Sequence, residues 1–196
     1  MGNLEIEKKH AMTEGACANH LLGANPTVLS IFVGETGKNV KKLINKVKDI
    51  TKHLHSVEID VNNKATILND TFLKANLHEL PRIFMIFDSE NSDDVKIVNE
   101  IIRQKDKINS GIKSDDERLT TWGFTYKDNE NTKDIDHCVV SKDINSIFET
   151  TFRMVLAEAK PGLIGMDFSA MTNLFHEKRV IKMQLNKYDS IDDFDI

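Results

Sequence analysis

A glycine-rich segment with a lysine follows the first strongly apolar run of the chain. That run, Thr27–Val33, is rich in β-branched residues, and G-E-T-G-K-N comes directly after it. Exposed backbone N–H groups at the start of a helix, beside the positive end of the helix dipole, can hold a phosphate group. The segment does not complete the phosphate-binding motif GxxxxGK[ST], because Phe32 and Asn39 stand at its first and last positions. Two interpretations stay open: a flexible turn between a strand and a helix, or a phosphate cradle formed by Gly34, Glu35, Thr36, Gly37, Lys38 and Asn39.

A second polar segment, D-S-E-N-S-D-D, follows the apolar run Ile83–Phe87. Its four carboxylates would repel a phosphate, because two like charges ~4 Å apart cost about 4 kcal/mol at an effective dielectric constant near 20. Ser89, Asn91 and Ser92 could donate hydrogen bonds to a phosphate that a divalent cation bridges to the acids. The alternative is that the segment only caps the helix that follows it.

One further carboxylate, Asp167, lies in the most individual segment of the chain, P-G-L-I-G-M-D-F-S-A-M. The segment follows a predicted helix, Asp143–Ala159, and Asp167 stands at the start of the next one. By itself, an aspartate there is most simply explained as the cap of that helix. The seven histidines have no ligand spacing, so the sequence predicts no metal site.

Strand-like and helix-like segments that could position these residues alternate along the chain. Helices are expected through Val40–Val47, Ala65–Leu77, Val95–Ile102, Asp143–Ala159 and Phe168–His176, and polar loops over 105–118 and Tyr126–Asp136. Strands are expected at Thr27–Val33, Ser56–Val61, Ile83–Phe87, Leu119–Thr125, His137–Ser141 and Val180–Leu185. This alternation predicts an α/β fold, a three-layer, doubly wound, Rossmann-like domain with a mostly parallel sheet. Ligands of such sheets bind at the carboxyl ends of the strands, where the loops described above would lie.

Length and composition predict one α/β domain over residues 26–185, an N-terminal extension over 1–25 and an acidic tail over 186–196. A net charge of -5 gives no reason to expect binding to nucleic acid or to a membrane. No apolar run approaches the ~18 residues of a membrane span, and no secretion signal is recognisable. Cys17 and Cys138 are far apart in sequence, which fits a reducing compartment, so we expect the cytoplasm.

The segment P-G-L-I-G-M-D-F-S-A-M resembles the loop of the tubulin/FtsZ family that reads roughly P-G-L-I-N-x-D-F-A-D-V. F-V-G-E-T-G-K-N-V-K-K-L-I is similar to that family's first strand, glycine loop and helix, and H-C-V-V-S-K-D-I to a later strand end. The resemblance covers about residues 26–185. It implies a GTPase domain that binds GTP with magnesium, in which Asp167 helps to hydrolyse the nucleotide held by the next subunit. No other cofactor is predicted.

The chain departs from the family where phosphates would bind. D-S-E-N-S-D-D stands in place of the signature G-G-G-T-G-T-G, Gly165 replaces the Asn of N-x-D, and the family's second domain has no counterpart after His176. These departures favour a degenerate, truncated member that works through protein–protein contact, with little or no GTP hydrolysis. Such a protein would cap or modulate a filament or division assembly, its partner being a filament-forming FtsZ-like relative or itself. Two alternatives stay open: an active FtsZ-like GTPase, and an α/β binding domain that shares only the topology.

Overall fold

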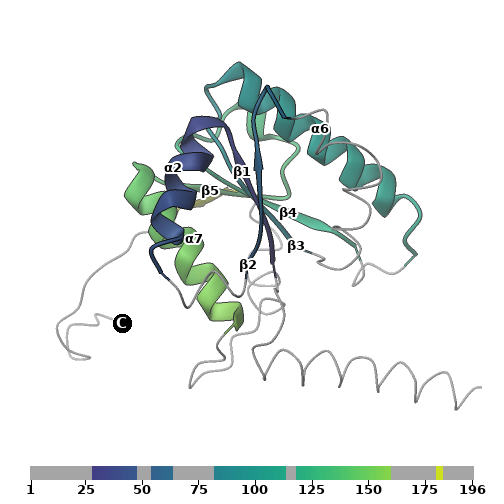
Figure 1. Ribbon diagram of the computed structural model, residues 1–196. Helices are drawn as coiled ribbons and strands as arrows, with labels where there is room; N and C mark the ends of the chain where they lie inside the picture. Colours follow the sequence, from purple (N-terminus) through teal and green to yellow (C-terminus); the bar gives the residue numbers. More distant parts are fainter. Residues whose placement is uncertain (1–27, 48–53, 64–81, 114–117, 160–179, 183–196) are drawn as a thin grey trace, which may run out of the picture.

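A computed structural model describes residues 28–47, 54–63, 82–113, 118–159 and 180–182, and these form an α/β fold around one sheet (Figure 1). The strands are β1 (Val28–Val33), β2 (Leu54–Ile59), β3 (Arg82–Ile86), β4 (Thr120–Thr125), β5 (His137–Val140) and β6 (Val180–Lys182). Their spatial order is β2-β1-β3-β4-β5-β6, and every neighbouring pair is parallel. The predicted α/β class with a mostly parallel sheet is therefore confirmed.

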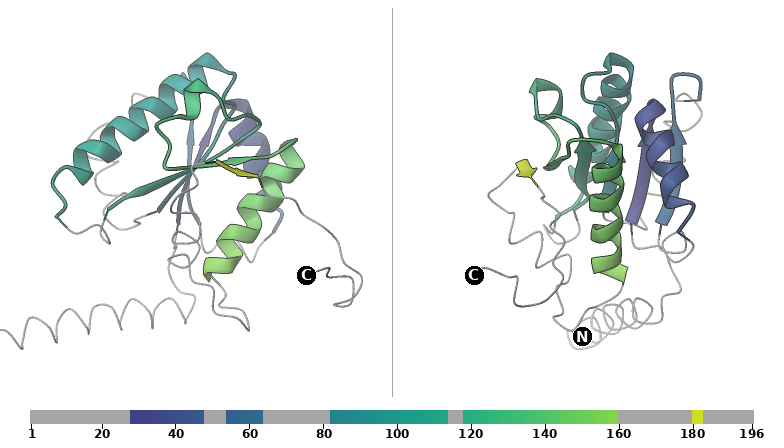
Figure 2. Two further views of the ribbon diagram at one scale, coloured as in Figure 1. Left: turned by 180° about the vertical axis from the view of Figure 1, so that it is seen from behind. Right: turned by 90° about the vertical axis from the view of Figure 1, so that its left-hand side faces the viewer.

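Helices cover both faces of this sheet. They are α2 (Gly34–Ile44), α6 (Ser92–Asn109), α7 (Ile144–Ala159) and the short 3-10 helix η2 (Glu130–Thr132). Residues of α2 and α7 share one buried cluster with Phe32 and Trp122, whereas α6 packs into a second cluster with Ile31 and Met85. Figures 1 and 2 show α6 on one side of the sheet and α2 and α7 on the other. All six residues of β1 are buried because helices cover both of its sides.

The second strand lies two residues earlier than predicted. It was expected at Ser56–Val61, but β2 ends at Ile59 and a turn begins at Asp60. Asp60 Oδ1 accepts hydrogen bonds from the backbone N–H groups of Asn62 (2.8 Å) and Asn63 (3.2 Å). The apolar Val61 suggested a strand residue, but it lies in this turn with its surface 49% exposed. The shift places Asp60 at the carboxyl end of β2.

Helix α6 continues beyond the predicted start of the polar loop at residue 105 and ends at Asn109. Lys105 is buried, and its Nζ donates to both carboxylate oxygens of Asp136, at 3.1 and 3.0 Å. The side chain of Asn109 bonds both the backbone N–H and the C=O of Leu119, each at 2.9 Å. These two contacts explain why this segment is helical. The charge of Lys105 is paired with Asp136, just before β5, and the end of the helix is bound by Leu119, just before β4.

Several predictions fall outside the described residues. They are the helices over 65–77 and 168–176, the extension 1–25, the tail 186–196, the domain limits at 26 and 185, the last three residues of the strand expected at Val180–Leu185, and Asp167. Within the described part of the chain, no helix is long and apolar enough to cross a membrane.

Candidate functional site

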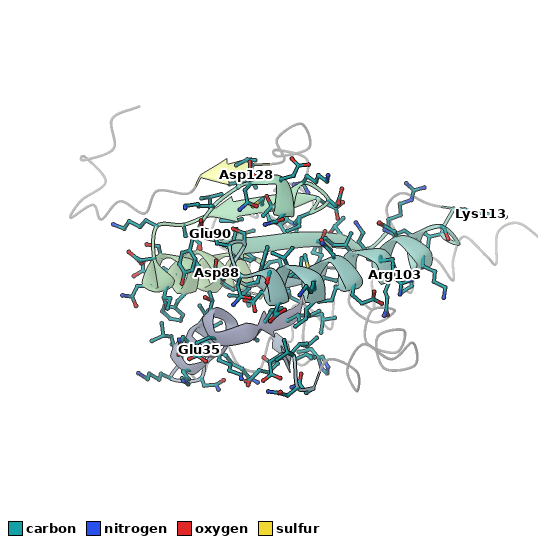
Figure 3. The ribbon with its side chains drawn as sticks, turned by 90° about the horizontal axis from the view of Figure 1, so that it is seen from above. Glu35, Asp88, Glu90, Arg103, Lys113 and Asp128 are labelled. Atoms are coloured by element: carbon teal, nitrogen blue, oxygen red, sulfur yellow. The ribbon has the colours of Figure 1, made fainter. Side chains whose placement is uncertain are left out.

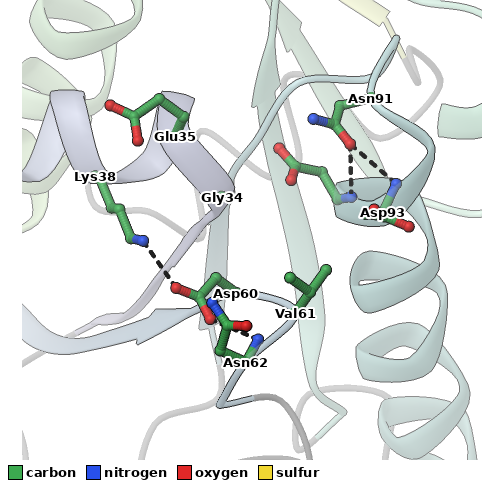
Figure 4. Close-up of a pocket in the computed structure, with 9 residues that line it drawn as sticks. Gly34, Glu35, Lys38, Asp60, Val61, Asn62, Asn91 and Asp93 are labelled. Carbon is green, nitrogen blue, oxygen red and sulfur yellow. Dashed lines mark hydrogen bonds and ion pairs between the residues drawn. The ribbon is translucent and has the colours of Figure 1, made fainter.

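A cavity of about 240 Å³ opens at the carboxyl ends of the first three strands (Figure 4). The chain leaves β1 for β2 on one side and later returns to β3 on the other side, so the loops after β1 and β3 diverge at this point. Open parallel sheets bind their ligands at such a reversal of strand order. The cavity is lined by Gly34, Glu35, Lys38, Asp60, Val61, Asn62, Asn91, Asp93 and Asp94.

The glycine segment after β1 belongs to the helix. Helix α2 begins at Gly34, directly after the strand, so the flexible turn expected between Val33 and the helix is wrong. Gly34 has φ +60°, a conformation that glycine adopts without strain. Val33 stands at the cap position and offers no side-chain hydrogen bond to the first turn. The open N–H groups of that turn therefore border the cavity without a side-chain cap.

The acidic segment after β3 reaches this first turn through Asp94. A Cβ atom added to Gly34 would lie 2.6 Å from Cγ of Asp94 and closer still to Oδ1, so the carboxylate rests on the Gly34 backbone. Asp94 is only 4% exposed, and its Oδ2 accepts the backbone N–H of Asp88 at 3.2 Å. Burial raises the pKa of Asp94, and the carboxylates of Asp88 and Asp93 raise it further. Sequence reasoning counted Asp94 among four repelling acids but did not single it out, because only the strand order brings it to Gly34.

Gly37 is explained by packing. Its added Cβ would lie 2.5 Å from the carbonyl carbon of Phe32 and 3.0 Å from the carbonyl oxygen of Ile86. Only a glycine lets α2 approach β1 and β3 so closely. Thr36 in the same turn is buried, and Asn39 lies further along α2, where its Oδ1 accepts from Lys42 Nζ at 3.2 Å. Of the six residues expected as a cradle, only Gly34, Glu35 and Lys38 line the cavity.

The lysine of the glycine segment is already engaged. Lys38 Nζ lies 2.8 Å from Asp60 Oδ2, at the end of β2 (Figure 4). The hydrogen bond between them is the main reason that the pKa of Lys38 is raised and that of Asp60 lowered. One turn later, Lys41 forms an ion pair with Glu58 at 3.3 Å. Both cations therefore neutralise acids of β2 or of the residue after it.

Ser89, a predicted phosphate ligand, is turned away from the cavity. It is fully buried; its N–H donates to Thr125 Oγ1 at 3.0 Å and its Oγ donates to the Lys127 carbonyl at 2.8 Å. Side-chain amides of Asn129 (3.4 Å) and Asn131 (3.0 Å) bond its carbonyl oxygen. This set of contacts, which we term the Ser89 clasp, fixes the loop after β3 to the loop after β4. Polar residues at two strand ends were the only signal of it in the sequence.

The segment after Ser89 caps α6, as one of the two interpretations predicted. Asn91 Oδ1 accepts the N–H groups of Asp93 at 2.9 Å and Asp94 at 3.3 Å. Ser92 is exposed at the first helical position and does not line the cavity. Two carboxylates, those of Asp93 and Asp94, thus lie in the first turn of α6, where the helix dipole favours them.

Acidic side chains gather at the carboxyl end of the sheet. Seen from above, Glu35, Asp88, Glu90 and Asp128 are spread over this end (Figure 3). Glu90 forms an ion pair with Lys127 at 2.7 Å, and Asp88 Oδ1 accepts the Glu90 N–H at 2.9 Å.

Among the residues that the structure describes, no group of three or more His, Cys, Asp or Glu is arranged to hold a metal ion.

Comparison with known proteins does not place the chain in a family. No family model matches it, and a search of curated proteins found no match. The resemblance to the tubulin/FtsZ family thus stays a prediction, and its most specific residue, Asp167, lies outside the described part of the chain.

Proposed function

We propose that this chain is a degenerate tubulin/FtsZ-like protein that acts mainly through protein–protein contact in the cytoplasm, with little or no GTP hydrolysis. One observation carries the proposal: the carboxylate of Asp94 rests on Gly34, in the turn that a nucleotide's phosphates would have to approach. The tubulin/FtsZ family is named in the proposal because the Asp167 segment resembles that family's catalytic loop.

The charges around the cavity oppose a phosphate chain. Glu35, Asp60, Asp93 and Asp94 contribute carboxylates. Lys38, the one lysine among the described residues that line the cavity, is paired with Asp60. Each unscreened carboxylate within ~4 Å of a phosphate oxygen costs about 4 kcal/mol at an effective dielectric constant near 20. Several carboxylates would repel the phosphates of a nucleotide in this way. The nucleotide would also have to displace Asp94 from Gly34.

A defective nucleotide site suggests a role in assembly. In a head-to-tail polymer each subunit offers its nucleotide to one neighbour and its catalytic loop to the other. A subunit with an Asp167 loop but no bound nucleotide could join one end of a filament and stop its growth. This reasoning favours capping or modulation of a filament or division assembly, with an FtsZ-like relative as the partner.

Co-sedimentation with a purified, filament-forming FtsZ-like protein tests this role. The expected result is shorter polymers at substoichiometric amounts of this chain, which pellets with them. The Asp167→Asn variant should lose the effect, because the loop would be the contact surface. Unchanged polymer length together with no co-pelleting would contradict the proposal.

A second candidate is an active FtsZ-like GTPase that binds GTP with magnesium. It is favoured by the uncapped first turn of α2, which borders a cavity at the reversal of strand order. In this case a cation would offset the acids, and Asp167 would position the attacking water. Phosphate release from GTP by the native chain, abolished in Asp167→Asn, would support this candidate over the first.

A further inference from the structure

We propose that residues 126–136, the connection between β4 and β5, form a strap that holds α6 at both ends and opens as one unit. The ion pair between Lys105 of α6 and Asp136 of the strap is its latch. The strap thereby positions one wall of the cavity, because Asn91 and Asp94, at the start of α6, line that cavity. The inference goes beyond the proposed function, since neither a nucleotide nor a filament enters it.

The strap holds the start of α6 through the Ser89 clasp. Ser89 stands just before the cap of the helix, Asn91. Its hydroxyl donates to the carbonyl of Lys127 at 2.8 Å, and the side-chain amides of Asn129 and Asn131 donate to its carbonyl oxygen at 3.4 and 3.0 Å. The strap supplies all three of these partners, so it fixes the residues from which α6 begins.

The strap holds the last turns of α6 through Asp136. Both of its carboxylate oxygens accept from Lys105 Nζ, and Oδ2 also accepts the backbone N–H and the hydroxyl of Thr121, each at 2.7 Å. The side chain of Lys105 is 5% exposed, so the bond to the strap is screened little by water. Lys105 also pairs with Asp106 at 3.2 Å, but that pair stays within α6. At the usual rise per residue, Asn91 and Lys105 are roughly 20 Å apart along the helix.

Between its two ends the strap packs on one face of β4. Thr121, Gly123 and Thr125 alternate along the strand and therefore share that face. Thr121 bonds the latch residue, and Thr125 accepts the N–H of Ser89 in the clasp. Between them, a Cβ atom at Gly123 would lie 2.8 Å from Cδ1 of Ile135, which is buried in the same cluster as α6. The small residues of β4 thus leave the strap room to lie between the clasp and the latch.

Polar bonds, with little apolar burial, hold the strap in place. Among residues 126–136 only Thr132 and Ile135 are buried. A segment with few buried apolar contacts can open at a free energy below that of global unfolding. Thr132 connects the two ends of the strap, because its N–H donates to the Asn129 carbonyl at 3.0 Å and its carbonyl accepts the Ile135 N–H at 3.1 Å. The clasp and the latch should therefore open together.

Hydrogen exchange of the full native chain, followed by NMR at increasing urea concentrations, tests the proposal. The amides of Ser89, Thr132 and Ile135 each donate a hydrogen bond within the clasp or the strap. Their protection factors should agree within about five-fold and fall in parallel with urea, while the amide of Ile31 in β1 should stay at least about ten-fold more protected. A larger spread among the three amides, or equal protection of the strap and Ile31, would overturn the proposal.

Two matched variants test the latch. Asp136→Ala removes the acceptor of Lys105, so the amide of Ser89, at the opposite end of the strap, should exchange at least about ten-fold faster. Asp134→Ala removes the same group from an exposed residue of the strap and should change the exchange of Ser89 less than about two-fold. Unchanged exchange in Asp136→Ala, or equal changes in both variants, would overturn the latch. If Asp136→Ala does not fold, the exchange pattern of the native chain decides.

The amide signal of Gly34 tests whether the strap positions the cavity wall. Asp94 rests on Gly34, so loosening of the loop before α6 should move this signal. We expect a shift in Asp136→Ala that is absent from Asp134→Ala. An unmoved Gly34 signal in Asp136→Ala would overturn the link between the strap and the cavity.

Discussion

The carboxylate of Asp94 rests on the backbone of Gly34, and this contact joins the loop after β3 to the first turn of α2. It unites two features that the sequence presents separately, a glycine segment and an acidic segment. Two separate features require glycine at position 34. Its φ is +60°, and Asp94 occupies the space that a Cβ atom would fill.

The two demands on Gly34 can be separated by a double-mutant cycle. Gly34→Ala should lower the free energy of unfolding by roughly 2–4 kcal/mol, from the positive φ and from the overlap with Asp94. In an Asp94→Ala background the overlap is gone, so the same substitution should cost only about 1–2 kcal/mol. Urea denaturation of the four proteins measures the coupling. Additive effects would show that Asp94 does not touch Gly34.

Gly37 should be intolerant of substitution for a structural reason. An added Cβ would meet backbone atoms of Phe32 and Ile86, which cannot move without shifting the sheet. We expect Gly37→Ala to lower the free energy of unfolding by about 3 kcal/mol, at the upper end of overpacking costs. Gly111→Ala is the matched control, because its nearest contact would be 3.5 Å away and the residue is exposed; its effect should stay within about 0.5 kcal/mol. Similar stabilities of the two variants would contradict this explanation.

The Ser89 clasp predicts a specific role for Thr125. Thr125→Val keeps the shape of the side chain but removes the acceptor of the buried Ser89 N–H. The unsatisfied N–H should cost about 1–3 kcal/mol of unfolding free energy, and the Ser89 amide should exchange with solvent faster. Thr120→Val, at the start of the same strand and without a hydrogen bond to its side chain from a described residue, serves as the control. Unchanged exchange at Ser89 in Thr125→Val would contradict the clasp.

Stability should depend on pH through Asp94. Burial, helped by Asp88 and Asp93, raises the pKa of Asp94 above 3.8 in the folded chain, so the folded state holds its proton more tightly than the unfolded state does. The contribution of this group to stability is therefore fully present below the unfolded pKa and is lost as the pH rises through the folded pKa. The Asp94→Asn variant has no carboxyl group here, so it does not lose stability as the pH rises through this interval. Its unfolding free energy relative to the native chain should rise with pH over that interval and be level below it.

The acids whose pKa is lowered by other partners do not affect this comparison. The pKa values of Asp60, Glu100 and Asp143 are lowered by their hydrogen bonds, so they stabilise the fold above their unfolded pKa in both proteins. Their effects cancel in the difference. A carbon-13 NMR titration of Asp94 checks the shift directly, and a pKa below 3.8 would contradict the prediction.

Much of the fold could be predicted because buried parallel strands have a distinctive composition. The runs before Gly34 and Asp88 are apolar and β-branched or aromatic, and both form central strands. Errors arose where a residue's neighbours in space differ from those in sequence. Val61 extended an apolar pattern but lies in an Asp60 turn, and Lys105 suggested a loop but is buried against Asp136.

The candidate site could be predicted only in part. The carboxyl ends of the strands were expected to meet, and the loops after β1, β2 and β3 do line one cavity. Which side chains face it depends on strand order and on caps. Asn91 binds the start of α6 and thereby sets the position of Asp94, while Ser89 is held by Thr125 on the far side of the loop. Neither contact has a signature in local sequence.

Titration calorimetry of the full chain with GTP and magnesium tests the central claim most directly, that the carboxylates around Gly34 have replaced a phosphate site. The account predicts no saturable heat up to about 1 mM GTP, with the Gly34 amide signal unchanged. Submillimolar binding that shifts the Gly34 amide would contradict it.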